Sequence, residues 1–476
     1  MSSPPYDRSA FLFRRDLRCI DNTGLRRACR ESRVVLPLFV FDPAQASDSQ
    51  NDYFSPNAFQ FLIESLRDLA SQIANRGGRL FVLEGKPADV LGQLFRSGAV
   101  DALYLNRDYT PFARRRDGRI RDAVKREGGS FHLTPDALLT EPEQVRKENG
   151  RPFFVYSRFR RKAQSIDILP PRRTLPADFD RTLPDPEDGT LPTTSLDAYD
   201  RHDNPDLALR GGRTAGKKRL QALTGFGNYA QERNRLDSYT VTGLSAHLKF
   251  GTVSPREVYA VVADRYGPRH KLISQLRWRD FYTHFAYHHP SVFGRAVRPK
   301  DKYIDWNRGG EAWERWCAGQ TGVPLVDAGM RELVETGYMH NRARMTVASF
   351  LTKHLLIDWR EGERFFARHL VDYDPSVNNG NWQWSASVGL DTIPLRMFNP
   401  YTQAEKFDKG AAYIQEWVPE LRDVNPDRLT SGEADDLSDA ADYPAPLVDH
   451  NSAYHRARQV FEDAQEEASG RYDVPA

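Results

Sequence analysis

The stretch SPNAFQFLIESLRDLASQIANRGG, residues 55–78, contains the clearest helical pattern in the first half of the chain and decides how that half folds. Its apolar residues recur at three- and four-residue spacing, which is the pattern of an amphipathic helix with one buried face. They are Phe59, Leu62, Ile63, Leu66, Leu69, Ala70 and Ile73. Because serine followed by proline is typical of a helix start, and a glycine pair of a helix end, we predict one long helix between Ser55 and Gly77.

Short apolar, β-rich runs lie on both sides of this helix and are separated by further helical patterns. The runs are Ala10–Phe13, Val34–Phe41, Arg79–Leu83, Ala102–Leu105 and Ser130–Leu133. Strands that alternate with helices predict βαβ units with a parallel sheet and right-handed crossovers. We therefore interpret residues 5–135 as a doubly wound α/β domain, with any ligand at the carboxyl ends of the strands. No GxGxxG motif follows the first run, so the sequence does not support a dinucleotide there.

The rest of the chain has a different character. Residues 136–205 lack periodicity and contain many prolines, which predicts a long surface connector and a domain boundary. From Leu207 onward the pattern is helical, so we interpret residues 206–476 as an all-α domain. All eight tryptophans lie between Trp278 and Trp417, which indicates that the two halves have different tasks.

Composition excludes several classes of protein. With 39% hydrophobic and 28% charged residues, a chain of 476 residues is expected to fold rather than stay disordered. It has no apolar run of about 18 residues and no signal-like stretch at its start, so we expect neither a membrane span nor secretion. The three cysteines lie far apart without a CxxC pair, which argues against a disulfide framework or a cysteine-based zinc site and fits the cytoplasm.

Several motifs of the helical half carry chemistry that the residues alone leave open. Residues 242–245, Thr-Gly-Leu-Ser, could cradle a phosphate at a helix start, although an ordinary helix cap is the commoner use of such residues. Residues 372–374, Asp-Tyr-Asp, could hold a cation or cap a helix, and the pattern favours a cap. His284 and His288 have the spacing of a zinc pair, but the glutamate of HExxH is absent, so we expect helix-surface histidines and no metal site.

The segment Asn378–Trp384, NNGNWQW, combines amides, a glycine and two tryptophans in seven residues. Residues two apart on a helix point to different faces, so the two indoles cannot share one environment. Together with Arg342 and Arg344, they suit a pocket that stacks a flat ring or a base. Buried core aromatics are an equally weighted alternative on the residues alone.

These residues resemble the photolyase/cryptochrome family, and the match spans nearly the whole chain in the expected order. The stretches that carry it are FLFRRDLRCIDNTGL (11–25), TGLSAHLKFGTVSPREV (242–258), QLRWRDFYTHF (275–285), the block from Thr336 to Gly389, FNPYTQAEKFD (398–408) and YPAPLVDH (443–450). The pattern is closest to class I cyclobutane pyrimidine dimer photolyases. The resemblance implies an α/β antenna domain, a long connector and an α-helical FAD-binding domain.

The resemblance also implies that FAD binds in the helical domain. The matching positions are Tyr229, Val241, Thr242, Gly243, Leu244, Ser245, Arg279, Arg344, Asp372, Tyr373, Asp374 and Asn378. Asp372 and Asp374 match the acidic pair near the flavin and Arg344 the arginine paired to it, which favours a binding role over a cap. Asn378 matches the residue facing flavin N5, where photolyases usually keep asparagine. Val241 stands where relatives often have threonine, so one hydroxyl contact is expected to be lost.

Two further sets of positions match the family. Trp382, Trp359 and Trp306 match the tryptophans that pass an electron from the surface to excited flavin, since indole is easily oxidised and short hops are faster than one long one. Trp278 and Trp384 match the aromatic walls that flank a flipped lesion. Further DNA contacts are implied for Arg233, Arg342 and Gln403.

The choice of lesion depends on three positions. Asn341 and Met345, within HNRARM, stand where (6-4) enzymes have two histidines, which is the pattern of cyclobutane dimer enzymes. Gln275 stands where cyclobutane dimer photolyases usually carry glutamate and (6-4) enzymes carry glutamine. Two positions outweigh one, so we predict light-driven repair of cyclobutane pyrimidine dimers in DNA, by electron transfer from excited reduced FAD to the flipped lesion.

Two alternatives stay open, a (6-4) photolyase and a cryptochrome-type blue-light photoreceptor without repair activity. The short tail after YPAPLVDH leaves little room for a signalling extension, which weakens the second. We expect damaged DNA as the partner, no membrane contact, and a monomer.

A second, antenna chromophore is expected in addition to FAD. Phe112-Ala113 stands where folate-binding relatives carry Asn-Glu. Asp108 and Lys249 resemble positions used by deazaflavin-binding relatives, so a deazaflavin-type pigment is favoured over folate.

Overall fold

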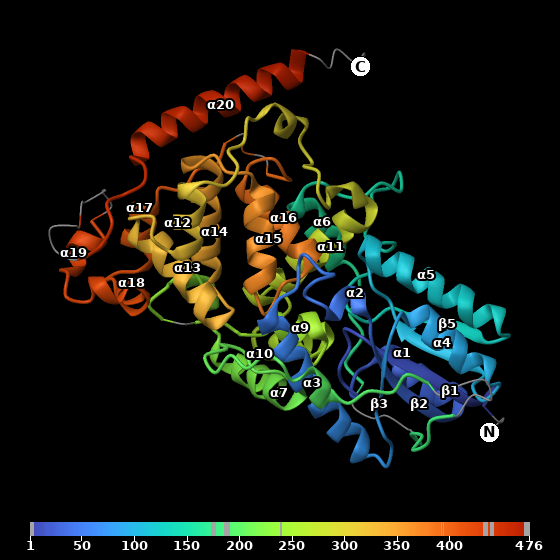
Figure 1. The fold of residues 1–476 in the computed structure, drawn as a ribbon. Helices are drawn as coiled ribbons and strands as arrows, with labels where there is room; N and C mark the ends of the chain where they lie inside the picture. Colours follow the sequence, from blue (N-terminus) through green and yellow to red (C-terminus); the bar gives the residue numbers. More distant parts are fainter. Residues whose placement is uncertain are drawn as a thin grey trace.

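The computed structural model describes residues 4–172, 178–184, 191–238, 240–391, 393, 395–431, 437 and 442–470. An α/β part and a helical part lie side by side, and the long C-terminal helix crosses the outer end of the helical part (Figure 1). Two pieces of the predicted connector, 173–177 and 185–190, lie outside the described residues, as does most of the acidic stretch 433–442. Among the described residues, no helix combines the length and the apolar character needed to cross a membrane.

The α/β part is built on a five-stranded parallel sheet, as predicted. Its strands are β1 (Tyr6–Phe13), β2 (Ser32–Phe41), β3 (Phe81–Glu84), β4 (Ala102–Asn106) and β5 (Ser130–Thr134). The order is β3-β2-β1-β4-β5, so the direction of winding reverses beside β1. The crevice outside the carboxyl ends of β1 and β4 is therefore the expected ligand position of a doubly wound sheet.

Five helices accompany the sheet, and the helix predicted from the opening stretch is the longest of them. They are α1 (Thr23–Glu31), α2 (Pro43–Ala46), α3 (Pro56–Ala74), α4 (Pro87–Arg96) and α5 (Pro111–Arg126). In α3 the Ser55 hydroxyl accepts a hydrogen bond from the Ala58 N–H at 3.1 Å, and Pro56 occupies the first turn. Leu66, Leu69 and Ile73 of its apolar face are completely or almost completely buried. The start and the buried face of α3 thus follow directly from the sequence.

The predicted connector contains more regular structure than its sequence indicates. It includes α6 (Tyr156–Gln164) and the 3₁₀ turn η1 (Leu196–Tyr199). Only Phe159 and Ala163 of α6 are buried. These two residues, four apart, are its whole apolar face, and the rest of the helix is strongly basic. Such a face is too small to detect as periodicity, yet Phe159 packs against Phe281 with ring centroids 5.2 Å apart.

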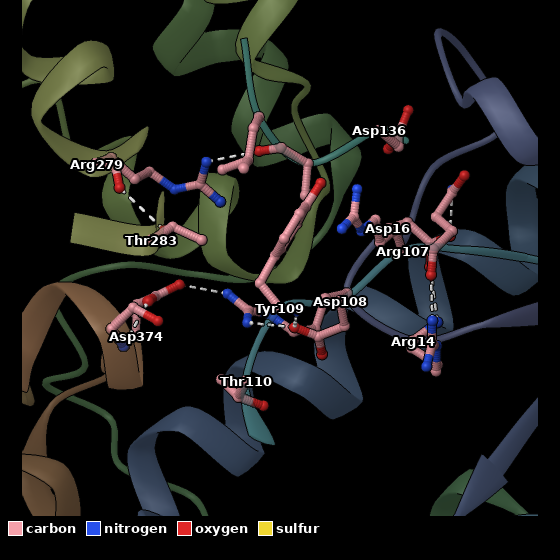
Figure 2. A pocket seen from close by; sticks show the side chains of 15 residues that line it. Arg14, Asp16, Arg107, Asp108, Tyr109, Thr110, Asp136, Arg279, Thr283 and Asp374 are labelled. Carbon is pink, nitrogen blue, oxygen red and sulfur yellow. Dashed lines mark hydrogen bonds and ion pairs between the residues drawn. The ribbon is translucent and has the colours of Figure 1, made fainter. Parts of the chain in front are cut away.

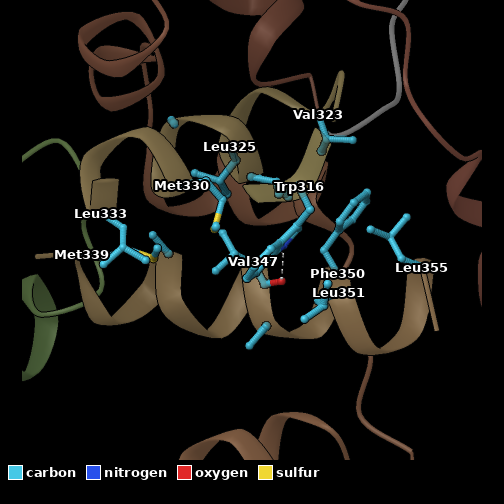
Figure 3. Close-up of a cluster of buried hydrophobic side chains, with 14 of the residues drawn as sticks. Trp316, Val323, Leu325, Met330, Leu333, Met339, Val347, Phe350, Leu351 and Leu355 are labelled. Carbon is cyan, nitrogen blue, oxygen red and sulfur yellow. Dashed lines mark hydrogen bonds between the residues drawn. The ribbon is translucent and has the colours of Figure 1, made fainter. Parts of the chain in front are cut away.

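The second part of the chain is helical, as predicted. Its elements are α7 (Arg213–Ala222), η2 (Leu223–Gly225), α8 (Tyr229–Glu232), α9 (Ser245–Phe250), α10 (Pro255–Tyr266), α11 (Lys271–His288), η3 (Pro290–Val292), η4 (Pro299–Tyr303), α12 (Glu311–Ala318), α13 (Pro324–Thr336), α14 (Asn341–Ser349), the π-helical turn η5 (Phe350–His354), α15 (Trp359–His369), α16 (Pro375–Ser385), α17 (Pro400–Phe407), α18 (Ala412–Trp417), η6 (Pro419–Leu421), α19 (Pro426–Leu429) and α20 (His450–Gly470). Its core surrounds Trp316, whose indole N–H donates to the Val347 carbonyl at 3.2 Å (Figure 3).

The two parts are fastened together behind the carboxyl end of β1. The Leu17 N–H donates to the Phe250 carbonyl at the end of α9. Gly251 follows with φ +66°, and a Cβ there would lie 2.2 Å from the Arg15 carbonyl oxygen, so only glycine allows this approach. A buried pair between Arg18 and Asp136 lies beside this contact, with Arg256 of α10 on the same carboxylate. The segment after β1 is therefore held rigidly against α9.

Candidate functional site

A cavity of about 300 Å³ opens in the helical part among α9, α11, α14, α15 and α16. It brings together ten of the twelve positions that the sequence assigns to FAD: Tyr229, Thr242, Leu244, Ser245, Arg279, Arg344, Asp372, Tyr373, Asp374 and Asn378. It is also lined by Gln275, Asn341, Met345 and Trp382 from the predicted catalytic set. Apolar side chains of α10, α11 and α15 complete the wall, which is the composition expected of a pocket for a flat organic ligand.

An ion pair fixes one wall of this cavity. Arg344 of α14 donates to both carboxylate oxygens of Asp372 at 3.1 and 3.0 Å, and its Nε donates to the Met339 carbonyl at 2.7 Å. Burial alone would lower the pKa of Arg344, but the Asp372 charge outweighs it and raises the pKa. This two-pronged geometry orients the carboxylate as well as neutralising it.

Asp374 is both a helix cap and a wall of the cavity. Its carboxylate accepts from the backbone N–H groups of Ser376 and Val377, which begin α16, and it pairs with Arg15 from the segment after β1. Burial would raise the pKa of Asp374, but Arg15 and then Arg279 outweigh burial and lower it. Asp374 therefore caps α16 and also lines the cavity.

Lys249 supplies a buried positive charge between two cavities. Its side chain lines the 300 Å³ cavity and a larger one beside it. Burial is the main reason that its pKa falls to about 7; Arg15 lowers it further, while Asp374 and Asp372 oppose the fall. A buried ammonium whose pKa is depressed in this way would be stabilised by an additional anion, such as a phosphate.

Three side chains that line the cavity, Asn341, Met345 and Gln275, are uncharged. Asn341 and Met345 lie one turn apart on α14, and the Asn341 amide contacts the Met345 sulfur at 3.5 Å. The Gln275 amide nitrogen of α11 is buried without a hydrogen-bond partner among the described residues. A buried amide N–H without a partner destabilises the protein, so this group is suited to donate a hydrogen bond to an acceptor atom of a ligand.

The residues of this cavity fit FAD. Arg279 and Lys249 can neutralise a pyrophosphate, and the unpaired Gln275 amide can donate to the ligand or its neighbour. The apolar stretch formed by Leu272, Leu276 and their neighbours suits a stacked ring system. FAD bound here would be held by Arg344 and Asp372 along one wall.

Several predicted site residues lie outside the cavity. Val241 and Gly243 precede α9, and Gly243 has φ +63°, as the turn into that helix requires. Trp278 is stacked on Tyr156 at a centroid distance of 3.6 Å, and the Arg396 guanidinium lies over the ring of Trp384 at 4.9 Å. Neither tryptophan lines the cavity, although both stay partly exposed.

Arg233, Arg342 and Gln403, the three predicted DNA contacts, lie close to one another. Arg342 donates to the Gln403 side-chain oxygen at 3.2 Å and to Asn234 at 2.8 Å. Burial, and then repulsion from Arg233, lower the pKa of Arg342 to about 10. Two guanidinium groups that repel one another are suited to share a phosphate.

Two tryptophans of the predicted relay are buried and the third is partly exposed. Trp382 lines the cavity and is 2% exposed, Trp359 at the start of α15 is completely buried, and Trp306 is partly exposed. The ring of Trp382 fills the space above Gly362, where a Cβ would lie 2.2 Å from it. Trp359 and Trp306 both donate their indole N–H to one carboxylate oxygen of Asp301, at 3.0 and 3.3 Å.

Sequence reasoning missed residues that complete this region. Glu363 of α15 accepts from the Asn379 amide at 3.2 Å, and burial raises its pKa to about 7. Its signal in the sequence is a carboxylate close to the aromatic pair Phe365–Phe366. Asp301 gave no such signal. Trp316 was also overlooked, and its ring meets that of Trp382 at 6.5 Å.

The expectation of two surface histidines was wrong for His284. This side chain is 3% exposed, and its Nε2 lies 2.7 Å from the Thr140 carbonyl in the connector. His288 is only partly buried, and its Nε2 lies 3.4 Å from the Pro142 carbonyl. The connector passes over this face of α11 and buries it, which the spacing along the helix could not reveal.

A second cavity of about 590 Å³ lies between the α/β part and the helical part. Phe39 and Phe41 of β2 form part of its wall, and the positions predicted to decide the antenna pigment, Asp108, Phe112, Ala113 and Lys249, all line it. A small polar cavity beside Asp108 reaches Asp374 and Arg279, which face it from the helical part (Figure 2). Lys249 and Tyr373 line both of the larger cavities.

Comparison with known proteins agrees with this architecture. A family model described as DNA photolyase matches residues 9–177, and one described as the FAD binding domain of DNA photolyase matches residues 272–463. A deoxyribodipyrimidine photo-lyase from Synechococcus sp. is 38% identical over 95% of this chain and 96% of its own length. A cryptochrome DASH from Natronomonas pharaonis is 32% identical over 94% of this chain and 99% of its own length.

A solved structure extends the similarity to three dimensions. The structure of an archaeal photolyase from Sulfolobus tokodaii, described as containing two FAD molecules, has a TM-score of 0.85 and 37% sequence identity. The similarity covers 96% of this chain and all of that one. With both family models matched in order, and with relatives above 30% identity along nearly its whole length, the chain belongs to the DNA photolyase family.

Proposed function

We propose that this protein repairs cyclobutane pyrimidine dimers in DNA, using light and FAD bound in the 300 Å³ cavity. The observation that carries the proposal is that Asn341 and Met345 of α14 and Gln275 of α11 line this cavity together. These uncharged side chains offer amide donors and a soft sulfur, which suit the carbonyl and methyl groups of two linked pyrimidines.

When bound, reduced FAD would supply light absorption and the electron that opens the cyclobutane ring, and the electron would return without net redox change. The protein's own residues bind and orient. Arg344 and Asp372 fix one wall, Arg279 and Lys249 compensate phosphate charge, and apolar side chains exclude water. Gln275 would donate its unpaired amide N–H to a lesion carbonyl.

DNA would be held by groups outside the cavity. Arg342 and Arg233, with Gln403 beside them, would contact phosphates, and such contacts give sequence-independent affinity that falls with salt. Trp278 and Trp384 are both partly exposed and would flank the flipped lesion. Extrusion of the lesion from the base stack is least costly where the stack is already damaged.

We infer that the 590 Å³ cavity takes a second chromophore of the deazaflavin or flavin type. The volume and the aromatic walls of β2 support this, as do Lys249 and Arg15 for an anionic substituent. The archaeal relative described as containing two FAD molecules also supports a flavin-like ring. Extraction of the purified protein, followed by chromatography and mass spectrometry of the released pigments, tests this assignment.

The decisive experiment for the function is repair of defined oligonucleotides by chemically reduced protein under blue light. One oligonucleotide carries a cyclobutane thymine dimer and the other a (6-4) product, and dark samples serve as controls. We expect light-dependent repair of the first. Repair of only the (6-4) product would refute the lesion assignment. Repair of (6-4) products is the second candidate function, because Gln275 resembles the glutamine of (6-4) enzymes.

A photoreceptor without repair activity is favoured by one comparison, the cryptochrome DASH relative. The same oligonucleotide assay separates the two functions. Absence of repair on both lesions, with FAD bound and photoreducible, would favour the photoreceptor.

A further inference from the structure

Asp301, at the 3₁₀ turn η4, connects two of the tryptophans of the predicted relay. Its Oδ1 accepts a hydrogen bond from the indole N–H of Trp359 at 3.0 Å and another from the indole N–H of Trp306 at 3.3 Å. The two indole nitrogens are therefore neighbours of the same oxygen atom. The residue is 7% exposed, and its other oxygen accepts from Arg360 at 2.6 Å. Three N–H groups thus converge on one buried carboxylate.

The surroundings of the two indoles differ in burial and in the groups that contact each ring. The Arg360 guanidinium lies over the ring of Trp359 at 4.6 Å, whereas Trp306 has the Phe461 ring of α20 edge-on at 5.9 Å. A cation over an indole face is favourable while the indole is neutral, but it repels an indole that has lost an electron. The carboxylate attracts such a positively charged indole at both positions.

We propose that Asp301 is a positioning residue that stabilises the oxidised tryptophan pair, and that Arg360 biases the positive charge toward Trp306. This inference rests on the proposed function, because it assumes flavin in the cavity and the relay through Trp382. Flavin, when bound and photoexcited, would take one electron from Trp382, which would then be replaced by one electron from Trp359, and that in turn by one from Trp306. The positive charge then rests on Trp306 until an external thiol returns one electron.

The indole N–H of Trp306 donates to Asp301 Oδ1, so the carboxylate acts by its charge and by fixing the ring. Trp306 gains most from it, because the same carboxylate at Trp359 is opposed by the guanidinium above that ring. The charge distribution thus makes the last hop favourable in one direction.

The test replaces the charge and keeps the shape. Asp301→Asn retains an oxygen that can accept from the indoles, and Asp358→Asn is a matched control. Asp358 also pairs with Arg360, at 3.0 Å, but the described hydrogen bonds connect it to no indole. Arg360→Gln is the second variant and removes the opposing charge over Trp359.

Three measurements are made on the flavin-bound proteins. In protein labelled with ¹⁵N-tryptophan, the indole N–H resonances of Trp306 and Trp359, assigned with phenylalanine variants, should move in Asp301→Asn and stay in Asp358→Asn. Transient absorption should show the terminal tryptophan radical, and photoreduction by thiol, reduced by about tenfold or more in Asp301→Asn and unchanged in Asp358→Asn, as expected for a lost charge at hydrogen-bond distance. Arg360→Gln should lower the share of the positive charge that reaches Trp306, because it removes the repulsion that disfavours oxidised Trp359.

Unchanged radical yield in an Asp301→Asn protein whose two resonances have moved would overturn the proposal. It would show that the negative charge of Asp301 does not stabilise the oxidised indoles. Equal losses in Asp358→Asn would also overturn it, because only general packing would then be involved. Repair by chemically reduced protein should be the same in all variants. If the unmodified protein showed no repair, the proposed function would be refuted. The radical measurements would still decide the role of Asp301.

Discussion

Loss of the Arg344–Asp372 pair should release FAD from the protein, and the structure indicates how the two single substitutions will differ. The change is Arg344→Ala, Asp372→Ala and their combination. The Arg344 side chain is 23% exposed and that of Asp372 only 5% exposed. Removing one partner of a buried pair leaves the other charge uncompensated, which costs about 3–5 kcal/mol when burial is complete.

The cost to folding should therefore be larger for Arg344→Ala, near the upper end of that range, because it leaves the more deeply buried carboxylate without its partner. It also leaves the Met339 carbonyl without its donor. Asp372→Ala should cost about 2–3 kcal/mol, since the remaining guanidinium can reach water. The double variant should cost less than the sum, because neither charge is left alone. FAD should be lost in all three, and most completely in the double variant.

The assay combines the flavin-to-protein absorbance ratio of the purified proteins with urea unfolding. Arg331 and Glu420 form the matched control, since they make a similar two-pronged pair at 2.8 and 2.7 Å with 21% and 29% exposed side chains, far from the cavity. Replacing both with alanine should lower stability slightly and leave flavin at one per chain. A double Arg344→Ala, Asp372→Ala variant that keeps full flavin would refute the reasoning.

Four further predictions follow from the same contacts. Trp306→Phe should abolish photoreduction of oxidised FAD but leave repair by chemically reduced protein intact; loss of both would contradict the relay. Trp278→Ala should weaken binding to dimer-containing DNA by roughly 1–3 kcal/mol, measured by titration, with little change on undamaged DNA. Equal losses on both DNAs would place its stacking on Tyr156 in the core. Burial lowers the pKa of Lys249 from its usual value of 10.5 to about 7 in the folded protein, so the unfolded chain holds more protons between these values. The free energy of unfolding of flavin-free protein should therefore rise with pH across this window, and Lys249→Met should remove that rise; an unchanged slope would refute it. Gln275→Glu should leave binding nearly unchanged and not lower repair of cyclobutane dimers per photon, because a carboxyl can share a proton with the reacting pyrimidine; a clear fall would favour (6-4) chemistry.

The strands and the longest helix of the α/β part could be predicted because their signals are local. Each apolar run of the first 135 residues forms a strand, and the Ser55 cap and the apolar stripe of α3 are read from neighbouring residues. The helix α6 could not be predicted, since its stability comes from Phe159 meeting Phe281 across more than a hundred residues of chain. The burial of His284 was missed for the same reason, because the covering segment belongs to the connector.

The residues of the candidate site could also be predicted only in part from the sequence. Resemblance assigned positions on α9, α11, α14 and α16, but periodicity and spacing alone could not have shown that they meet in one cavity. The double role of Asp374, capping α16 while pairing with Arg15 from the other part of the chain, needs the fold to be visible. Asp301 is the extreme case. Nothing near it in the sequence indicates that Trp306, five residues on, and Trp359 share its carboxylate.

The direction of the predicted relay follows from how the helical part is packed. Trp382 and Trp359 lie in the core among apolar side chains, and Trp306 lies at the edge of that core beside α20. A positive charge is poorly stabilised in an apolar interior and better stabilised where water can reach it, so burial alone favours its movement outward. The Asp301 carboxylate attracts a positive charge on either Trp359 or Trp306. The Arg360 guanidinium opposes this attraction at Trp359. Burial and charge therefore act in the same direction, and a substitution that buries Trp306 more deeply should slow the last step even with Asp301 intact.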